Sequence, residues 1–367
     1  MTTRLRLVLL VARPAVVFLL ALSGLVGLAL GGVADDPLAV GRLLVLVTAF
    51  VVYAVSCNDL ADLEVDRVNL PDDARRPLVT GSAGARDVVL VAAGAAMVAV
   101  VAAGTQGLLA VCLTLAGLAV ATAYSLPPFR ISRRGVVAPL VLPALFVGLP
   151  FVLGVLAGRD LRATDLVLLA ALYVGFIGRI VLKDFRDVVG DRMFGKRTFL
   201  VRHGRRVTCV VSGVCWVTGS LLLVAATPAA GWVFAACQLA LAAVAVALVV
   251  ALARTGSHRR EERLVSALAI VGRASVAAVF FQVTADRPWV GALCVACLTA
   301  LSLALAGEML RHGPRQRRVR VTDPRVTPSA VDRAATGSSS SALRGLRVPA
   351  NDVTASSLLR PDPSIRQ

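Results

Sequence analysis

The chain has 367 residues, of which 57% are hydrophobic, 17% charged and 5% aromatic. Its mean hydropathy of +0.79 is far too high for a soluble domain of this length, so the composition excludes an ordinary globular protein. The net charge is +17, yet the basic residues lie in loops between apolar runs. Because the sequence has no basic soluble domain, it also excludes a nucleic-acid-binding protein.

Apolar runs long enough to cross a bilayer as a helix recur along the chain. We expect ten of them, at 7–31, 38–56, 87–104, 107–124, 136–157, 164–182, 207–227, 231–253, 264–284 and 288–308. The runs are continuous rather than alternating, which favours helices over strands. The sequence therefore predicts an all-α fold, a multi-span bundle of transmembrane helices.

Arginine is concentrated in alternate loops, at 67–86, 129–134, 179–206 and 254–263, and again after residue 310. Cytoplasmic loops of membrane proteins carry such an excess of basic residues. The pattern therefore predicts a multi-pass protein of the cell membrane with both termini in the cytoplasm.

The end of the chain differs in composition from the rest. Residues 311–367 are rich in arginine, serine, threonine and proline, which is typical of disordered segments. We expect two parts: a transmembrane domain at 1–310 and a disordered basic cytoplasmic tail at 311–367. A basic tail of this kind is suited to contact with anionic lipid.

Two acidic clusters follow apolar runs at their predicted cytoplasmic ends. The first contains Asn58, Asp59, Asp62 and Asp66, and the second contains Lys183, Asp184, Asp187 and Asp191. In both, the aspartates have the spacing i, i+3, i+7, which predicts that they share one face of a helix. A single aspartate at a helix end is more often solvated than functional. Two clusters with matching spacing after equivalent runs instead favour a site formed between two diverged halves.

The chemistry of the clusters favours a divalent cation. Crowded carboxylates repel one another unless a cation lies between them. Hard oxygen ligands suit Mg²⁺, which in turn suits a phosphorylated substrate. The only two lysines of the chain, Lys183 and Lys196, flank the second cluster. These residues predict diphosphate chemistry at a membrane surface, with Mg²⁺ as the cofactor.

Five short motifs occur in the order found in one protein family. They are NDLADLEVD at 58–66, RPL with a later glycine at 76–81, YSLPPFR at 124–130, KDFRDVVGD at 183–191 and GKRT at 195–198, and Arg13-Pro14 matches a pair common in the first span. On these motifs the chain resembles the UbiA-type intramembrane prenyltransferases over roughly 7–300. The resemblance implies nine helices around a central cavity, one fewer than the apolar runs, and does not extend to the tail.

The resemblance also implies a reaction and a role for each motif residue. The family moves an isoprenyl group from its diphosphate to an acceptor. One Mg²⁺ would be held by Asp59, Asp62 and Asp66, and another by Asp184, Asp187 and Asp191. Asn58 would coordinate the metal or orient the acceptor. The candidates for binding phosphate oxygens are Lys183, Lys196, Arg76 and Arg130. Arg179, one helical turn before Lys183, is expected to join them.

Arg13 and Tyr124 complete the predicted substrate-binding residues, and each has a structural alternative. Arg13 is equally suited to reaching the lipid headgroups. Tyr124 is suited to anchoring its helix at the membrane interface, and Arg130 to enforcing the topology. For these three residues the sequence leaves both interpretations open.

The favoured function is Mg²⁺-dependent prenyl transfer to an aromatic or quinone-precursor acceptor. The first alternative is a terpene cyclase, because the same ionisation without an acceptor leads to cyclisation. Cyclisation benefits from aromatic faces around the cation, and the low aromatic content of 5% therefore favours transfer. A transporter or lipid-binding protein is a weaker alternative, since no matching glycine- and proline-broken spans support transport. Alcohol phosphotransferases also bind Mg²⁺ through aspartates, but their DGxxAR…GxxxDxxxD arrangement is absent from the sequence.

Overall fold

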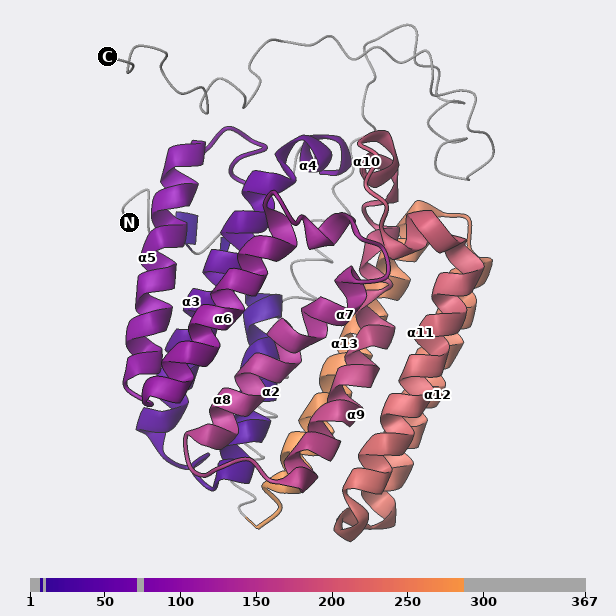
Figure 1. Ribbon diagram of the computed structural model, residues 1–367. Coiled ribbons are helices and arrows are strands. Elements are labelled where there is room, and N and C mark those ends of the chain that lie inside the picture. Colours follow the sequence, from indigo (N-terminus) through magenta and orange to yellow (C-terminus); the bar gives the residue numbers. More distant parts are fainter. Residues whose placement is uncertain (1–6, 9–10, 71–75, 287–367) are drawn as a thin grey trace, which may run out of the picture. The chain divides into compact units, whose positions relative to one another are not determined.

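The computed structural model describes residues 7–8, 11–70 and 76–286, which form helices joined by short loops (Figure 1). All of them belong to one compact unit, Met1–Arg320. The helices are α2 (Pro14–Gly31), α3 (Pro37–Ala61), α4 (Leu63–Asn69), α5 (Ala85–Gly104), α6 (Leu108–Ser125), η1 (Ile131–Arg133), α7 (Ala138–Pro143), η2 (Ala144–Gly148), α8 (Leu149–Leu156), α9 (Ala163–Ile180), η3 (Lys183–Phe185), α10 (Val188–Met193), α11 (Phe199–Ala226), η4 (Pro228–Ala230), α12 (Gly231–Arg254) and α13 (His258–Val283).

The helices confirm the predicted all-α membrane fold. In the described part of the chain, eight helical segments are long and apolar enough to cross a membrane, and Ala15–Gly31 is a shorter apolar helix. These nine segments correspond to the first nine predicted runs. The predicted tenth run, 288–308, and the predicted tail, 311–367, lie outside the described residues. The long apolar helices suit a multi-pass integral membrane protein.

Helix α2 lies between two groups of helices. On one side it contacts α3, which packs against α5 and α6, and on the other it contacts α8 and α13. The second group continues from α13 to α12, then to α11 and α9 (Figure 1). The two halves of the chain therefore meet along α2, α8, α9 and α13, so that residues far apart in sequence can share a site.

Glycines allow the closest of these helix contacts. A Cβ atom added to Gly154 in α8 would lie 2.3 Å from the carbonyl oxygen of Gly24 in α2, and one added to Gly158 would lie 2.2 Å from that of Gly31. Helices α9 and α11 approach in the same way, because a Cβ on Gly219 would lie 2.7 Å from the Cα of Gly175. Small residues bring helix backbones together in membranes, where no hydrophobic effect drives association.

The fifth predicted run is a single span with an irregular centre. Helix α7 ends at Pro143, a π-helical turn follows over Ala144–Gly148, and α8 completes the span. A proline inside a helix removes one backbone hydrogen bond and displaces the preceding turn, and single π turns are common at functional sites. The start of α7, at Ala138 and Pro139, lies beside the acidic motifs.

Candidate functional site

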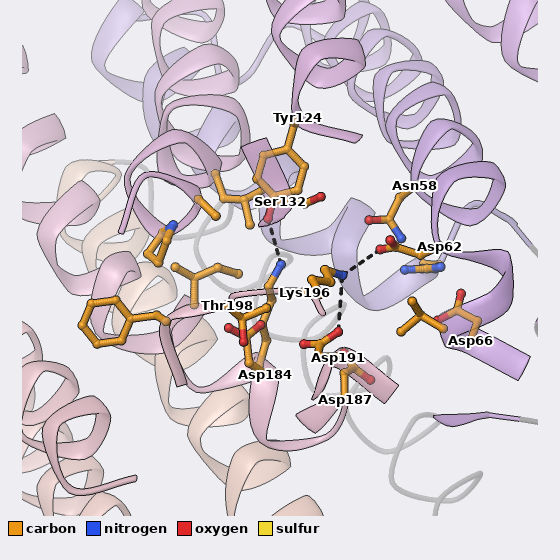
Figure 2. Close-up of a pocket in the computed structure, with 18 of the residues that line it drawn as sticks. Asn58, Asp62, Asp66, Tyr124, Ser132, Asp184, Asp187, Asp191, Lys196 and Thr198 are labelled. Atoms are coloured by element: carbon orange, nitrogen blue, oxygen red, sulfur yellow. Dashed lines mark hydrogen bonds and ion pairs between the residues drawn. The ribbon is translucent and has the colours of Figure 1, made fainter. Parts of the chain in front are cut away.

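Both acidic motifs face one polar cavity of about 130 Å³. Of the fourteen residues predicted for the site, eleven line it: Arg13, Asn58, Asp62, Asp66, Arg76, Tyr124, Lys183, Asp184, Asp187, Asp191 and Lys196. Figure 2 shows Asn58, Asp62 and Asp66 on one side of the cavity and Asp184, Asp187 and Asp191 on another. The predicted convergence of the two motifs is therefore present in the structure.

Neither motif is a continuous helix, and the expectation of one helical face for each is wrong. Helix α3 ends before Asp62, whose φ and ψ are −106° and 15°, and α4 begins after it. Asp187 occupies the equivalent place before α10, with φ and ψ of −108° and 2°. The chain therefore breaks at the middle aspartate of both motifs. This shared break lets each motif bend around the cavity.

Asn69 joins the two short helices that follow the breaks. Its Nδ2 donates to the carbonyl oxygen of Asp187 at 3.1 Å, and its Oδ1 accepts from the backbone N–H of Gly190 at 2.8 Å. A Cβ on Gly190 would lie 2.7 Å from the Asn69 Nδ2. Helices α4 and α10 thus contact each other through one buried amide. Asn69 was not among the predicted residues, because nothing in the local sequence marks a partner more than a hundred residues away.

Lys196 connects the two motifs directly. Its Nζ lies 2.9 Å from Asp62 Oδ2 in the first motif and 3.5 Å from Asp191 Oδ1 in the second. Both contacts are drawn in Figure 2. A single half-buried ammonium group between two carboxylates offsets the repulsion that would otherwise separate the motifs.

Two arginines neutralise the far side of the first motif. Arg76 Nη1 lies 2.5 Å from Asp59 Oδ1 and 2.7 Å from Asp66 Oδ2. Arg13 also forms an ion pair with Asp59. Asp59 is buried and does not line the cavity. It therefore holds Arg13 and Arg76 in place instead of facing the cavity itself.

Lys183 is oriented by an aromatic side chain. Its Nζ donates to the hydroxyl of Tyr124 at 3.0 Å and lies 5.5 Å from the centre of the ring. Tyr124 is buried at the end of α6, so it is positioned to contact the cavity and not the lipid headgroups. The interaction fixes a flexible lysine side chain beside the second motif.

The carboxylates in the short helices are poised between two charge states. Burial raises the pKa of Asp66 to about 7, although Arg76 opposes the shift. Burial also raises the pKa of Asp191 to about 7, against the effect of Lys196. Burial lowers the pKa of Lys196, but Asp62 and Asp191 outweigh it and raise the pKa overall. The cavity therefore holds a permanent ammonium and two acids that ionise near neutral pH.

The donor atoms suit Mg²⁺, although the side chains are paired with cations in this arrangement. Within residues 7–8, 11–70 and 76–286, no three His, Cys, Asp or Glu side chains are gathered as a metal site. The reason is that Asp59, Asp62 and Asp66 each turn toward an arginine or lysine. The cavity nevertheless offers several hard carboxylate oxygens. Asp191 Oδ1 is buried and accepts no hydrogen bond from the described residues, although Lys196 lies 3.5 Å away. The assignment of one metal ion to each motif remains a prediction.

Two predicted residues lie away from the polar cavity. Arg130 does not line it; its backbone φ is 41°, and its Nε is buried without a hydrogen-bond partner. Arg179 lines a separate cavity between α9, α11 and α13. Its place before Lys183 predicted a shared site, but α9 ends at Ile180 and Lys183 begins η3, and the two side chains line different cavities.

The loop after α6 packs against the loop after α10. The backbones of Arg134 and Arg197 pair, and a Cβ on Gly135 would lie 2.7 Å from the carbonyl oxygen of Arg197. The pairing brings Ser132 and Thr198 into the lining, together with Phe199. Thr198 belongs to the predicted motif GKRT, whereas Ser132 and Phe199 were not predicted. The contact between the two loops depends on the fold.

The remaining lining is apolar and comes mainly from the irregular span and its neighbour. The residues are Val65, Ala138, Pro139, Leu142 and Ile180. The cavity thus joins a charged wall, which suits a phosphate group, to an apolar wall, which suits a hydrocarbon chain.

Comparison with known proteins identifies relatives of the chain. The family model described as UbiA prenyltransferase family matches residues 17–271. The digeranylgeranylglyceryl phosphate synthase of Halobacterium salinarum is 34% identical over 261 residues, which cover 66% of this chain and 88% of that protein. The bacteriochlorophyll synthase 33 kDa chain of Rhodobacter capsulatus is 29% identical over 168 residues, which cover 43% of this chain. In that match the chain spans about half of the relative's length, 54%.

Solved structures share the fold. A UbiA homolog from Archaeoglobus fulgidus, bound to GPP and Mg²⁺, superposes with a TM-score of 0.59 at 18% identity. The match covers 76% of this chain and 99% of that one. A UbiA homolog from Aeropyrum pernix K1 gives a TM-score of 0.57 at 19% identity, covering 74% and 97%. These structures have the same arrangement of helices as the chain described here.

Proposed function

We propose that this chain, which belongs to the UbiA prenyltransferase family, transfers an isoprenyl group from a prenyl diphosphate to a small-molecule acceptor and releases diphosphate. The observation that carries the proposal is the contact of Lys196 with Asp62 and Asp191, which joins both acidic motifs across one cavity. A mixed wall of carboxylates, lysines and arginines there suits a diphosphate bound through a divalent cation.

Magnesium would be held by the carboxylates of the two motifs, Asp62 and Asp66 on one side and Asp184, Asp187 and Asp191 on the other. When bound, it would neutralise negative charge on the diphosphate. The solved homolog from Archaeoglobus fulgidus contains GPP and Mg²⁺, which supports this choice of donor and cofactor. Asp59 would act indirectly, by holding Arg13 and Arg76.

The side chains of the cavity would stabilise the departing diphosphate. As the carbon–oxygen bond breaks, negative charge grows on the diphosphate oxygen and positive charge on the allylic carbon. Lys183, fixed by Tyr124, and Lys196 would bind the developing negative charge. The acceptor would then form a bond to the allylic carbon and lose a proton. The apolar lining at Leu142 and Ile180 would receive the hydrocarbon chain.

The acceptor is proposed at the level of chemical class. The low aromatic content favours transfer over cyclisation, and an aromatic or quinone-precursor acceptor is the first candidate. A second candidate is a glyceryl phosphate, because the relative from Halobacterium salinarum, matched over 88% of its length, is a digeranylgeranylglyceryl phosphate synthase. The loop charges support a cell-membrane location with the cavity facing the cytoplasm.

The test is transfer by the purified full-length chain. Labelled prenyl diphosphates of several lengths are incubated with phenolic and glyceryl phosphate acceptors, with Mg²⁺ or with EDTA. We expect a prenylated product that requires both the acceptor and Mg²⁺. Asp62→Asn and Asp187→Asn should each lose most of the turnover, whereas Asp160→Asn, outside both motifs, serves as the matched control.

Two results would count against the proposal. Rapid formation of one cyclic hydrocarbon or alcohol from the donor alone would establish the cyclase instead. Equal turnover by the control and by both motif variants would show that the cavity is not the site of the reaction.

A further inference from the structure

A second cavity lies inside the described bundle, between α9, α11 and α13, with a volume of about 30 Å³. It shares no lining residue with the polar cavity. Most of its wall is apolar, including Leu19, Val147 and Leu172. Two side chains with strong hydrogen-bond donors, Arg179 and Trp216, interrupt this apolar wall.

One donor nitrogen of each of these two side chains is not used by the described residues. Arg179 Nη1 and Trp216 Nε1 are both buried without a hydrogen-bond partner. Trp216 is 4% exposed. The guanidinium of Arg179 contacts the ring of Phe176 at 5.6 Å, which leaves its N–H groups free to donate in the plane. Buried donors of this kind are normally satisfied by an acceptor.

The charge of Arg179 is also uncompensated among the described residues. None of the described residues that line this cavity carries a carboxylate. Arg273 follows Gly272, which lines the cavity. The Ser275 hydroxyl is already engaged with Gln238 Oε1 at 2.8 Å. Two arginines inside membrane-spanning helices without an acid are costly unless an anion or water accompanies them.

We propose that this cavity binds a small oxyanion, of which a carboxylate is the simplest. Its volume accommodates about two water-sized groups, so only the two oxygens of a carboxylate would lie inside it and the rest of the ligand would extend between the helices. The planar guanidinium of Arg179 matches such a group in a bidentate arrangement, and the indole N–H of Trp216 supplies a further donor. A diphosphate is too large for this space, so the site is separate from the proposed prenyl transfer.

The test uses Trp216 as its own reporter in the full-length protein. The other two tryptophans, Trp232 and Trp289, are replaced by phenylalanine. Octanoate, a membrane-soluble carboxylate, acetate, a water-soluble one, and octanol, a neutral control, are titrated while Trp216 emission is recorded. We expect a saturable change with octanoate or acetate and none with octanol. Which of the two acids binds more tightly identifies a lipid or an aqueous source.

Variants separate a charged site from internal water. Arg179→Gln keeps hydrogen-bond donors without the charge and should weaken carboxylate binding at least about tenfold. Arg179→Lys should retain part of the affinity, and Arg254→Gln, at the end of α12 and outside the cavity, should bind like the parent. Octanoate should also raise the Tm of the parent but not that of Arg179→Gln.

Two outcomes would overturn the proposal. One is an emission change that rises linearly and equally with octanoate and octanol, which would mean that the cavity holds water only. The other is unchanged affinity in Arg179→Gln. Neither measurement requires prenyl transfer, so failure here is distinguishable from failure of the proposed enzymatic function.

Discussion

Lys183 is the residue whose role follows most directly from its contacts. Its ammonium is fixed by Tyr124 and lies in the cavity beside Asp184 and Asp187. A positive charge here would stabilise the leaving diphosphate more than the intact donor, so its removal should lower the rate. We expect Lys183→Ala to lower kcat by about 10²–10³-fold. Tyr124→Phe, which removes only the hydroxyl, should lower it less.

Steady-state kinetics with varied donor concentration distinguish the possible roles of Lys183. A rise in KM with unchanged kcat would mean that Lys183 binds the donor uniformly and that another residue stabilises the leaving group. Both side chains were predicted from the sequence: Lys183 because lysine is scarce and flanks the second acidic cluster, and Tyr124 because it begins the motif YSLPPFR. The contact between Lys183 and Tyr124 was not, since it joins residues 59 positions apart.

The two acids with raised pKa values predict how metal binding depends on pH. Asp66 and Asp191 each have a pKa of about 7 in the folded protein, well above the ordinary value of about 3.9. Below pH 7 they are mostly protonated, and protons compete with Mg²⁺. Affinity for Mg²⁺, measured by titration calorimetry, should therefore rise between pH 6 and pH 8. Asp191→Asn should bind more weakly and with a shallower pH dependence.

A second consequence of these pKa values concerns the metal-free protein. Because folding raises both values, the folded state binds more protons than the unfolded state between about pH 4 and pH 7. Their contribution to stability is present at low pH and is lost as the pH rises through 7.

An affinity for Mg²⁺ that did not change between pH 6 and pH 8 would contradict the charge states described for the cavity.

At the scale of elements, the short helices α4 and α10 depend on Asn69. Asn69→Asp removes the donor to the Asp187 carbonyl and adds another carboxylate, so the two motifs should separate. We expect about a tenfold or greater loss of activity, with a higher Mg²⁺ requirement, because such outer partners of metal sites typically contribute 10–100-fold. Asn351→Asp makes the same chemical change outside the described residues and is the matched control.

A double-mutant cycle tests the same contact from its other side. Gly190→Ala places a Cβ 2.7 Å from Asn69 Nδ2, and Asn69→Ala removes the obstruction. The effects of the two substitutions should therefore not be additive. Additive losses would show that Asn69 and Gly190 act independently.

The glycine contact between α2 and α8 predicts a large effect of added volume. In Gly154→Leu the new side chain would meet the backbone of Gly24 at 2.3 Å, and the helices would have to separate. We expect a destabilisation of about 3 kcal/mol or more, above the usual range for overpacking, because backbone cannot move aside as a side chain can. Gly94→Leu, in α5 with open space around it, is the control. Thermal unfolding in detergent measures both, and equal effects would contradict the close contact.

The elements also show what the sequence could predict. The bounds of the nine described spans agree with the apolar runs to within a few residues, except at α2, α3, α11 and α13, because hydropathy alone sets where the lipid-facing segments lie. The breaks at Asp62 and Asp187 were not predicted. A spacing of i, i+3, i+7 is compatible with a continuous helix, and the breaks are accompanied by the long-range contact through Asn69.

At the scale of the whole molecule, the sequence predicted that both motifs share one cavity, because equivalent spans carry them to the same end of the bundle. It did not predict the second cavity. Arg179 is close to Lys183 in sequence, but α9 directs it toward α11 and α13. Which side of a helix faces a neighbour is decided by close contacts such as those of Gly175 and Gly178, and these depend on partners far along the chain.

The placement of the two lysines has a consequence for chemical modification. Lys183 and Lys196 are the only lysines of the chain and both line the polar cavity, while every other basic side chain of the motifs is an arginine. A general amine-acylating reagent should therefore modify side chains only at the site, abolish activity, and be excluded by a bound prenyl diphosphate with Mg²⁺. Full activity after acylation of both lysines, verified by mass spectrometry, would contradict their placement. The scarcity of lysine makes an unselective reagent act as a site-directed label.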